Sequence, residues 1–211
     1  MKNGLLLFLG ISATLAFSWA GVVLSAHNQY GNLTQYKDPI EETLFPAPLN
    51  GLADQGRQVY QDLGCVACHT QQVRRDGFGG DVARKWGERQ SVARDYIRET
   101  TVFVGSSRLG PDLRNVGVRI GEADYFYKLL YAPEKLAPGM PSHAFLFDVR
   151  PVRPGQASPK ALKVSGVPAG HEVVPTHRAE ALVAYLLSLK DTYEYPEAKP
   201  YVAPAKKEGG H

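Results

Sequence analysis

Hydrophobic side chains form an unbroken run at residues 5–24, LLLFLGISATLAFSWAGVVL, which contains no charged residue. Twenty helical residues at about 1.5 Å each reach about 30 Å, the thickness of the hydrocarbon layer of a bilayer. We therefore predict a membrane anchor over residues 1–26. Lys2 is the only charge before the run, and the preference of cations for the cytoplasm predicts that the rest of the chain lies on the opposite side.

Two other interpretations of this segment stay open. A signal peptide could be cleaved after Ala20, where Ser18 and Ala20 form a small-x-small site. The apolar run continues to Leu24, further than a signal peptide requires, so we favour the retained anchor. A buried helix of a soluble domain is the third interpretation, and the length of the run makes it the weakest.

The clearest helix after the anchor lies near the C-terminal end. Leu182, Tyr185, Leu186 and Leu189 fall at i, i+3, i+4 and i+7 and form one apolar face. Thr176 is a candidate N-cap for this helix.

Two more helices are expected before it. Residues 52–63 contain Gly56, which would let another helix approach closely, and Tyr60 lies one turn later on the same face. Gly64 then ends this helix. Residues 122–131 predict a short helix that ends before a proline.

Polar and proline-rich stretches set the boundaries between these elements. Residues 27–50 are predicted to be a linker, 51–190 one domain, and 191–211 a flexible tail rich in Pro, Lys, Glu and Gly. Prolines spread through residues 144–175 predict mostly loop, and the best short strand pattern lies at residues 101–104. The fold class predicted from these elements is mainly α with long loops.

The composition argues against nucleic-acid binding and leaves few candidate sulfur ligands for a metal. The chain is 44% hydrophobic and 21% charged, as in a folded domain, and its net charge of +3 is too small to indicate nucleic-acid binding. Arginine and lysine are frequent in residues 70–95, where we expect a surface loop, with a short helix as a further alternative. The two cysteines are Cys65 and Cys68 and the two methionines are Met1 and Met140, which leaves few soft metal ligands.

Both cysteines lie in the sequence Cys65-Val66-Ala67-Cys68-His69, the C-x-x-C-H signature of covalent heme c attachment. The thiols add to the two heme vinyl groups, and two intervening residues let one turn of backbone span the distance between those vinyls. His69 then supplies a nitrogen ligand to the iron. The alternatives are a redox-active thiol pair, expected in a βαβ surround, and half of a zinc site, for which the sequence shows no second half.

Heme iron has a sixth ligand position, for which Met140 is the favoured residue. It lies in the loop Pro138-Gly139-Met140-Pro141, and a thioether raises the heme potential relative to a second histidine. His143, three residues later, is the competing candidate. The other histidines are expected at ordinary surface positions: His27, His171, His177 and His211.

The surroundings of the heme can also be predicted. The second ring nitrogen of His69 needs a hydrogen-bond acceptor that fixes the ring. Pro111, in the turn at residues 110–112, offers a rigidly held carbonyl, although this segment could also be a simple turn. Candidate partners for the heme propionates are Arg108, Arg114 and Trp86.

These residues together resemble the cytochrome c fold. A helix precedes C-x-x-C-H, a G-P-D-L loop faces the histidine, a Met-Pro loop faces the other side, and a C-terminal helix packs on the first. The resemblance covers most of residues 50–190. It implies a mainly α chain with one N-terminal transmembrane helix followed by a cytochrome c-like heme domain with long loops.

A narrower resemblance rests on three stretches that follow the anchor: CVACHTQQVR, GSSRLGPDLRNVGVR and MPSHAF. They are similar to the mono-heme subunit (subunit II, FixO/CcoO-like) of cbb(3)-type cytochrome c oxidases. The chain departs from the family pattern at Gln72 and Val73, where methionine and isoleucine are usual, and at Val104, where tryptophan is frequent. The positions that match are Thr70, Gln71, Arg74, residues 105–117, Met140 and Pro141.

The resemblance implies a subunit of a bacterial terminal oxidase. It would be anchored by a single pass in the inner membrane, with its heme domain in the periplasm. It would hold one covalent heme c, receive electrons from another c-type cytochrome subunit and pass them to the catalytic heme-copper subunit. Oxygen would be reduced in that partner and not on this chain.

Three other functions share some of these features. The cytochrome c subunit of nitric oxide reductase also has one anchor, one C-x-x-C-H and a Met-Pro loop, but the Gly-Ser and G-P-D-L stretches favour the oxidase. A free membrane-tethered electron shuttle would be monomeric, whereas the long segment 144–175 and the aromatic residues at 125–131 favour partner contacts. A heme-based gas sensor or peroxidase would need an open iron position.

Overall fold

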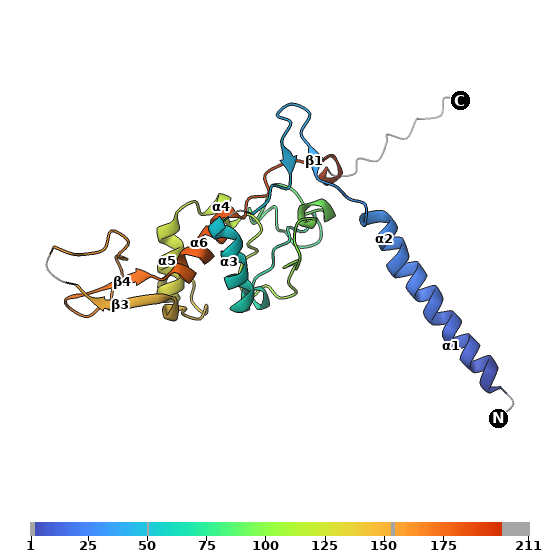
Figure 1. The fold of residues 1–211 in the computed structure, drawn as a ribbon, viewed down its shortest axis with the longest axis horizontal. Coiled ribbons are helices and arrows are strands. Elements are labelled where there is room, and N and C mark those ends of the chain that lie inside the picture. The colour runs from blue at the N-terminus through green and yellow to red at the C-terminus, as the bar shows by residue number, and fades with distance from the viewer. Residues whose placement is uncertain (1–2, 50, 153–154, 200–211) are drawn as a thin grey trace. The chain divides into compact units, whose positions relative to one another are not determined.

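The computed structural model describes residues 3–49, 51–152 and 155–199 (Figure 1). The chain is mostly helical, as predicted, and divides into two compact units. One unit combines the chain up to Pro46 with Val92–Glu99, and the other contains Ala47–Ser91 and the chain from Thr100 onward.

The described residues form short elements joined by long irregular segments. The strands make two separate antiparallel pairs, β1 Tyr36–Lys37 with β2 Leu44–Phe45, and β3 Phe147–Pro151 with β4 His171–Pro175. The α-helices are α1 Gly4–Trp19, α2 Ser25–Tyr30, α3 Gly51–Asp62, α4 Val116–Arg119, α5 Ala123–Tyr131 and α6 His177–Ser188.

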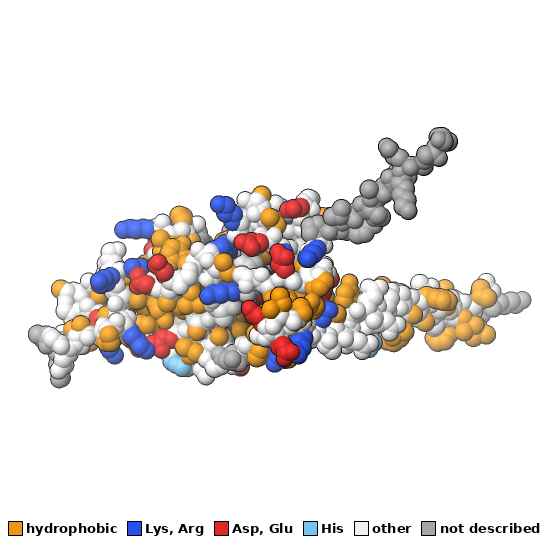
Figure 2. Space-filling view, turned by 90° about the horizontal axis from the view of Figure 1, so that it is seen from above, with side chains coloured by type: hydrophobic (Ala, Val, Ile, Leu, Met, Phe, Trp, Pro, Cys, Tyr) orange, Lys and Arg blue, Asp and Glu red, His pale blue; other side chains and the backbone are white. Residues whose placement is uncertain are grey.

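The N-terminal helix is continuous from Gly4 to Tyr30, because a π-helical segment, Ala20–Leu24, joins α1 to α2. This 27-residue helix has a mean hydropathy of 2.0 and is long and apolar enough to cross a membrane. None of its residues is buried, and Figure 2 shows hydrophobic side chains along it. It extends beyond the predicted anchor because polar residues continue the helix without continuing the apolar pattern. Lys2, on which the predicted orientation depends, lies outside the described residues.

The predicted linker, residues 27–50, contains structure of its own. The hairpin β1–β2 lies within it, and Gln35 Nε2 donates to the Pro46 carbonyl at 2.8 Å. Arg98 Nη1 donates to Gln35 Oε1 at 3.3 Å, so Val92–Glu99 belongs to this first unit. The sequence had assigned that segment to the heme domain.

The second unit is built on the crossing of α3 and α6, as the sequence predicted. Gly56 allows close contact, because a Cβ at that position would lie 1.8 Å from the Ala181 carbonyl oxygen. Tyr60 is 1% exposed, and its ring packs edge-on against that of Tyr185 at a centroid distance of 5.4 Å.

The predicted ends of the helices are also confirmed. Gly64, just beyond α3, has a left-handed φ of 67°. The Thr176 hydroxyl caps α6 by accepting from the Ala179 N–H at 3.4 Å. The helix α5 ends at Tyr131, and Pro133 starts a separate 3-10 turn.

One prediction about strands holds and one was wrong. Residues 144–175 are mostly loop, as predicted, but also contain the hairpin β3–β4, in which Pro151 and Pro175 stand at strand ends and interrupt no ladder. Residues 101–104 form no strand, because the Phe103 and Val104 carbonyls share a single donor, the Gln71 N–H, at 3.2 Å each.

Two predictions about exposed segments also need correction. Gln71 and Asp81 are buried, so residues 70–95 do not form a simple surface loop. At the start of the predicted tail, Tyr195 is buried and its ring lies 5.0 Å below the guanidinium of Arg89. The rest of that tail, residues 200–211, lies outside the described residues.

Candidate functional site

The C-x-x-C-H segment follows directly after α3. Gly64 ends the helix, and Cys65–Ala67 form a 3-10 turn. The His69 N–H donates to the Cys65 carbonyl at 3.0 Å and closes this turn. It therefore holds Cys65, Cys68 and His69 together, with both thiols half-buried and free.

The turn at residues 110–112 contacts the His69 ring and fixes its orientation. Its Nδ1 lies 2.8 Å from the Pro111 carbonyl oxygen, which is the contact predicted from the sequence. Because a carbonyl only accepts, Nδ1 carries the proton and the lone pair of Nε2 remains for a metal. Gly110 permits the approach, since a Cβ there would lie 2.2 Å from His69 Cε1.

A cavity of about 350 Å³ lies beside this ring. Cys65, His69, Pro111 and Met140 all line it, so the structure brings four of the predicted site residues together. Cys68 is outside the lining but belongs to the same turn as Cys65. Cavities of this size with mainly apolar walls are typical of cofactor sites. The rest of the wall is mostly apolar: Tyr60, Leu113, Val116, Ile120, Tyr125, Phe126, Leu129, Leu130, Leu136, Ala137, Leu182 and Leu186.

The loop that carries Met140 forms part of the wall. The Met140 N–H donates to the Ala137 carbonyl at 3.0 Å, and Gly139 turns the chain with a φ of 95°. The Met140 side chain packs against the hydrophobic core. His143 lines the same cavity, and burial lowers the pKa of its ring. The structure therefore brings both candidate sixth ligands to the cavity.

Arg108 does not line the cavity, and its predicted role as a propionate partner stays a prediction. Its guanidinium binds the buried Asp81 carboxylate, with Nη2 2.8 Å from Oδ2 and Nη1 2.5 Å from Oδ1. Its Nε donates to Thr70 Oγ1 at 2.9 Å and its Nη2 to the Gln72 carbonyl at 2.7 Å. The physical reason is that a buried carboxylate requires a cation, and Arg108 supplies it.

The other two predicted propionate partners also lie outside the cavity lining. Arg114 is buried and forms an ion pair with Asp191. The ring of Trp86 lies 4.9 Å from the Arg84 guanidinium and 5.2 Å from that of Arg108. These cation–π contacts engage Trp86 within the protein.

Asp112 has a role that the sequence reasoning missed. Its buried carboxylate accepts from the Gln72 N–H at 2.8 Å and from the Thr70 hydroxyl at 2.5 Å. It ties the Pro111 segment to the residues that follow His69, and so it fixes the acceptor for Nδ1. Its place directly after Gly-Pro in the G-P-D-L motif could have indicated this role.

Arg119 is a second residue that the sequence reasoning missed. Its side chain lines the cavity, and its Nη2 donates to the Asp112 carbonyl. Its Nε is buried and finds no acceptor among the described residues, and burial lowers the pKa of the guanidinium. An unpaired buried donor on this wall fits a ligand that brings its own acceptor, as heme does with its propionates. Arg119 is the last residue of the family-like stretch GSSRLGPDLRNVGVR, and this position could have indicated a role at the site.

The two alternatives to heme fit the site less well. Burial raises the pKa of the Cys65 thiol to about 11, whereas a redox-active thiolate needs a lowered pKa. Within the described parts of the chain, no three His, Cys, Asp or Glu side chains gather as they would around zinc. Two half-buried thiols, an oriented imidazole and a thioether at an apolar cavity fit heme c.

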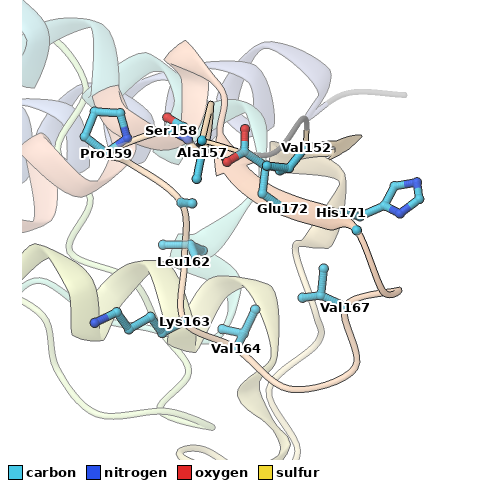
Figure 3. A pocket seen from close by; sticks show the side chains of 13 residues that line it. Val152, Ala157, Ser158, Pro159, Leu162, Lys163, Val164, Val167, His171 and Glu172 are labelled. Carbon is cyan, nitrogen blue, oxygen red and sulfur yellow. Dashed lines mark hydrogen bonds between the residues drawn. The ribbon is translucent and has the colours of Figure 1, made fainter.

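A second, larger hollow of about 930 Å³ is lined by the segment that connects β3 to β4 and by the first residues of β4 (Figure 3). Leu162, Val164 and Val167 supply apolar surface to it, and Glu172 accepts from the Ser158 N–H at 2.7 Å at its edge. None of the predicted site residues lines this hollow, so it has no part in the candidate site.

Comparison with known protein families identifies a match over most of the chain. A search of curated proteins finds none. The family model for cytochrome c oxidase, mono-heme subunit/FixO, matches residues 6–191, which include the N-terminal helix, the C-x-x-C-H segment and the Met140 loop. The match confirms the family resemblance of the three sequence stretches, and it implies one heme and a place in an oxidase complex beside a catalytic subunit. The chain belongs to the family of the mono-heme subunit of cytochrome c oxidase (FixO).

Proposed function

We propose that this chain is a membrane-anchored c-type cytochrome that passes single electrons to the catalytic subunit of a bacterial cbb(3)-type oxidase in aerobic respiration. The observation that carries the proposal is the His69 ring, oriented by Pro111 beside a cavity that Cys65 and Met140 also line. The family match supports the role of a heme subunit in an oxidase.

Two kinds of bond would hold the cofactor, covalent thioethers and axial ligands to the iron. Cys65 and Cys68 would bind heme c through thioethers, and His69 and Met140 would supply the axial nitrogen and sulfur. When bound, the heme supplies an iron that alternates between the ferrous and ferric states. Pro111 holds the His69 ring in one orientation, so little reorganisation is expected between these states.

The wall of the cavity also influences the electron affinity of the site. Most of its side chains are apolar and several, such as Phe126 and Leu182, are almost completely buried. An apolar, water-poor surround disfavours the additional positive charge of the oxidised state. The wall therefore favours a raised potential, in the same direction as a sulfur ligand.

The N-terminal helix would attach the heme domain to the membrane. The span Gly4–Tyr30 is long enough for one membrane crossing. We propose a single pass through the bacterial inner membrane, with the cytoplasmic end at Lys2 and the heme domain in the periplasm. Another c-type cytochrome subunit would donate the electrons, and oxygen reduction would take place in the heme-copper partner.

Purification of the native complex through a tag on this chain tests the proposed function. We expect a copper-containing, oxygen-reducing subunit and a further c-type cytochrome to co-purify in mild detergent. Oxygen uptake with a reduced electron donor should depend on the tagged subunit. A partner that contains iron without copper and reduces nitric oxide would overturn the proposal, as would a monomeric cytochrome without partners.

A further inference from the structure

We infer that Arg119 binds a heme propionate and supplies the cation that this carboxylate needs inside the cavity. The inference rests on the proposed function, because it requires heme in the cavity beside His69. The three candidates predicted from the sequence, Arg108, Arg114 and Trp86, are all outside the cavity lining.

The backbone holds Arg119 in a fixed place. It is the last residue of α4, and this short helix packs backbone to backbone against the end of α6. The Gly117 N–H donates to the Leu189 carbonyl at 3.1 Å, and a Cβ on Gly117 would lie 2.3 Å from the Leu187 carbonyl oxygen. These contacts tie α4 to the end of α6 and so position Arg119 on the wall of the cavity.

The partners of Arg108, Arg114 and Arg119 differ in charge. Arg108 pairs with Asp81 and Arg114 with Asp191, so each guanidinium is neutralised by a carboxylate of the chain. Arg119 takes part in none of the ion pairs among the described residues, and its Nη2 reaches only the neutral Asp112 carbonyl. Its buried Nε has no acceptor among the same residues. The guanidinium is partly buried and feels the charge of the Asp112 carboxylate without forming an ion pair with it. A ligand carboxylate would satisfy the buried Nε donor and add the direct ion pair.

The position of Arg119 also matches the shape of the cofactor. The residue lines two cavities: the apolar one beside His69, and a second of about 430 Å³ whose wall carries charged side chains. Heme has an apolar ring with two charged propionates on one edge, so it needs a polar boundary at one side of an apolar slot. Arg119 stands at such a boundary. The charged side chains of the second cavity include Lys85, Glu88, Arg89, Asp191 and Glu194.

The chemistry of the guanidinium suits this role. Nε and one Nη nitrogen form a planar fork that matches the two oxygens of a carboxylate. With Nη2 already on the Asp112 carbonyl, the buried Nε is the donor that remains to be satisfied. A fixed cation beside the propionate also disfavours the oxidised iron, so Arg119 would raise the potential of the site.

The test uses the full heme-loaded chain in detergent and compares Arg119→Gln with Arg119→Lys. We expect Arg119→Gln to shift the ferrous/ferric equilibrium about fivefold toward ferric at a fixed electrode potential, which is about 40 mV for one electron. Arg119→Lys keeps the charge and should shift it less. Arg75→Gln, which removes an exposed arginine, is the matched control and should leave the equilibrium close to that of the wild type.

Infrared difference spectra of the same proteins identify the group that Arg119 binds. With ¹³C-labelled propionate carboxyls, the bands that change on reduction should shift between the wild type and Arg119→Lys. Label-sensitive bands that are identical in both proteins, or an unchanged potential in Arg119→Gln, would overturn the inference while heme attachment persists. Absence of covalent heme from the wild type would instead overturn the proposed function. If Arg119→Gln does not accumulate, the comparison of Arg119→Lys with the wild type decides.

Discussion

At the scale of single residues, the site depends on contacts behind His69. The Pro111 carbonyl accepts from Nδ1, and the Asp112 carboxylate ties the same segment to Thr70 and Gln72. These contacts lie within the protein and need no ligand to form. The imidazole is therefore oriented by the fold, which is the usual arrangement behind a metal-binding histidine.

Met140→Ala should remove the sulfur ligand and leave the thioether-bound heme in place. We expect the iron–sulfur absorption of the oxidised protein to vanish, the potential to fall, and azide to bind the opened iron position. His143→Ala is the matched control because His143 lines the same cavity, and it should keep the absorption band. Loss of the band in His143→Ala but not in Met140→Ala would show that the ligand assignment is wrong.

Asp81 makes the stability of the second unit depend on pH. Burial opposes its ionisation, but hydrogen bonds and charge from Arg108, together with the Arg74 N–H, hold the pKa of this carboxyl below its ordinary value. The folded-state pKa is thus lower than the unfolded value of about 3.9. The contribution of the pair is therefore complete above about pH 3.9 and is lost as the pH falls through the folded-state pKa.

Asp81→Asn should lower the free energy of unfolding by about 1–3 kcal/mol at pH 7, because Arg108 loses its closest carboxylate and keeps only that of Asp112, 3.6 Å away. The loss should shrink in acid, because the Asp81 carboxylate of the wild type becomes protonated there and no longer pairs with Arg108. Urea unfolding of the heme-loaded protein at pH 7 and in acid measures both effects. Asp76→Asn, at an exposed position, is the control. Equal losses for Asp81→Asn at both pH values would contradict the argument.

Sequence reasoning predicted the residues whose role is set by close neighbours. The C-x-x-C-H spacing and the rigid turn at Pro111 are local features, and the structure has the predicted contact between His69 and Pro111. The arginines could not be assigned in this way. Arg108 and Arg119 have the same chemistry, and only the fold shows that a buried carboxylate engages the first while the second reaches the cavity.

At the scale of secondary-structure elements, the crossing of α3 and α6 positions the C-x-x-C-H turn. The turn follows α3 after two residues, so any displacement of α3 would move the thiols relative to the cavity. Gly56 determines how closely the two helices approach, because the Ala181 carbonyl occupies the space of a side chain. The ring contact between Tyr60 and Tyr185 continues the same interface.

Gly56→Ala should lower the free energy of unfolding by about 1–3 kcal/mol, because the added methyl group must push the helices apart. Thermal unfolding of the heme-loaded protein, followed by circular dichroism, measures the loss. Gly121→Ala is the matched control, since a Cβ there meets no atom within 4 Å. A Gly56→Ala protein as stable as the control would contradict the close packing of α3 on α6.

The helices could be predicted because their apolar faces repeat with the helical period and their caps are local. The hairpin β3–β4 could not, because its strands are separated by a long irregular segment and each ends in a proline. Residues 101–104 have a strand-like composition but find no partner strand, and Phe103 packs against Tyr60 instead. Pairing between distant segments is a property of the fold that the local pattern does not contain.

At the scale of the whole molecule, the chain combines a helix long and apolar enough to cross a membrane with a unit that contains the candidate heme site. The helix is exposed along its length, which is the arrangement expected of a segment that lipid or partner helices surround. The family match extends over both parts, so the N-terminal helix belongs to the family pattern.

The proposed orientation predicts which side of the membrane exposes the heme domain. Protease added to intact spheroplasts should digest the domain, and inside-out vesicles should protect it. Detection with an antibody against residues 51–190 and the remaining covalent heme gives the readout. Protection in spheroplasts together with digestion in inside-out vesicles would place the domain in the cytoplasm and contradict the proposal.

Mass spectrometry of the full chain, made in a host that matures c-type cytochromes, is the most direct test of covalent heme binding. We predict a mass increase of one heme, located on a peptide that contains both Cys65 and Cys68, and colour that survives extraction with acidic acetone. The double variant Cys65→Ala, Cys68→Ala should lose this heme. A wild-type chain that is colourless and has its unmodified mass would contradict the account.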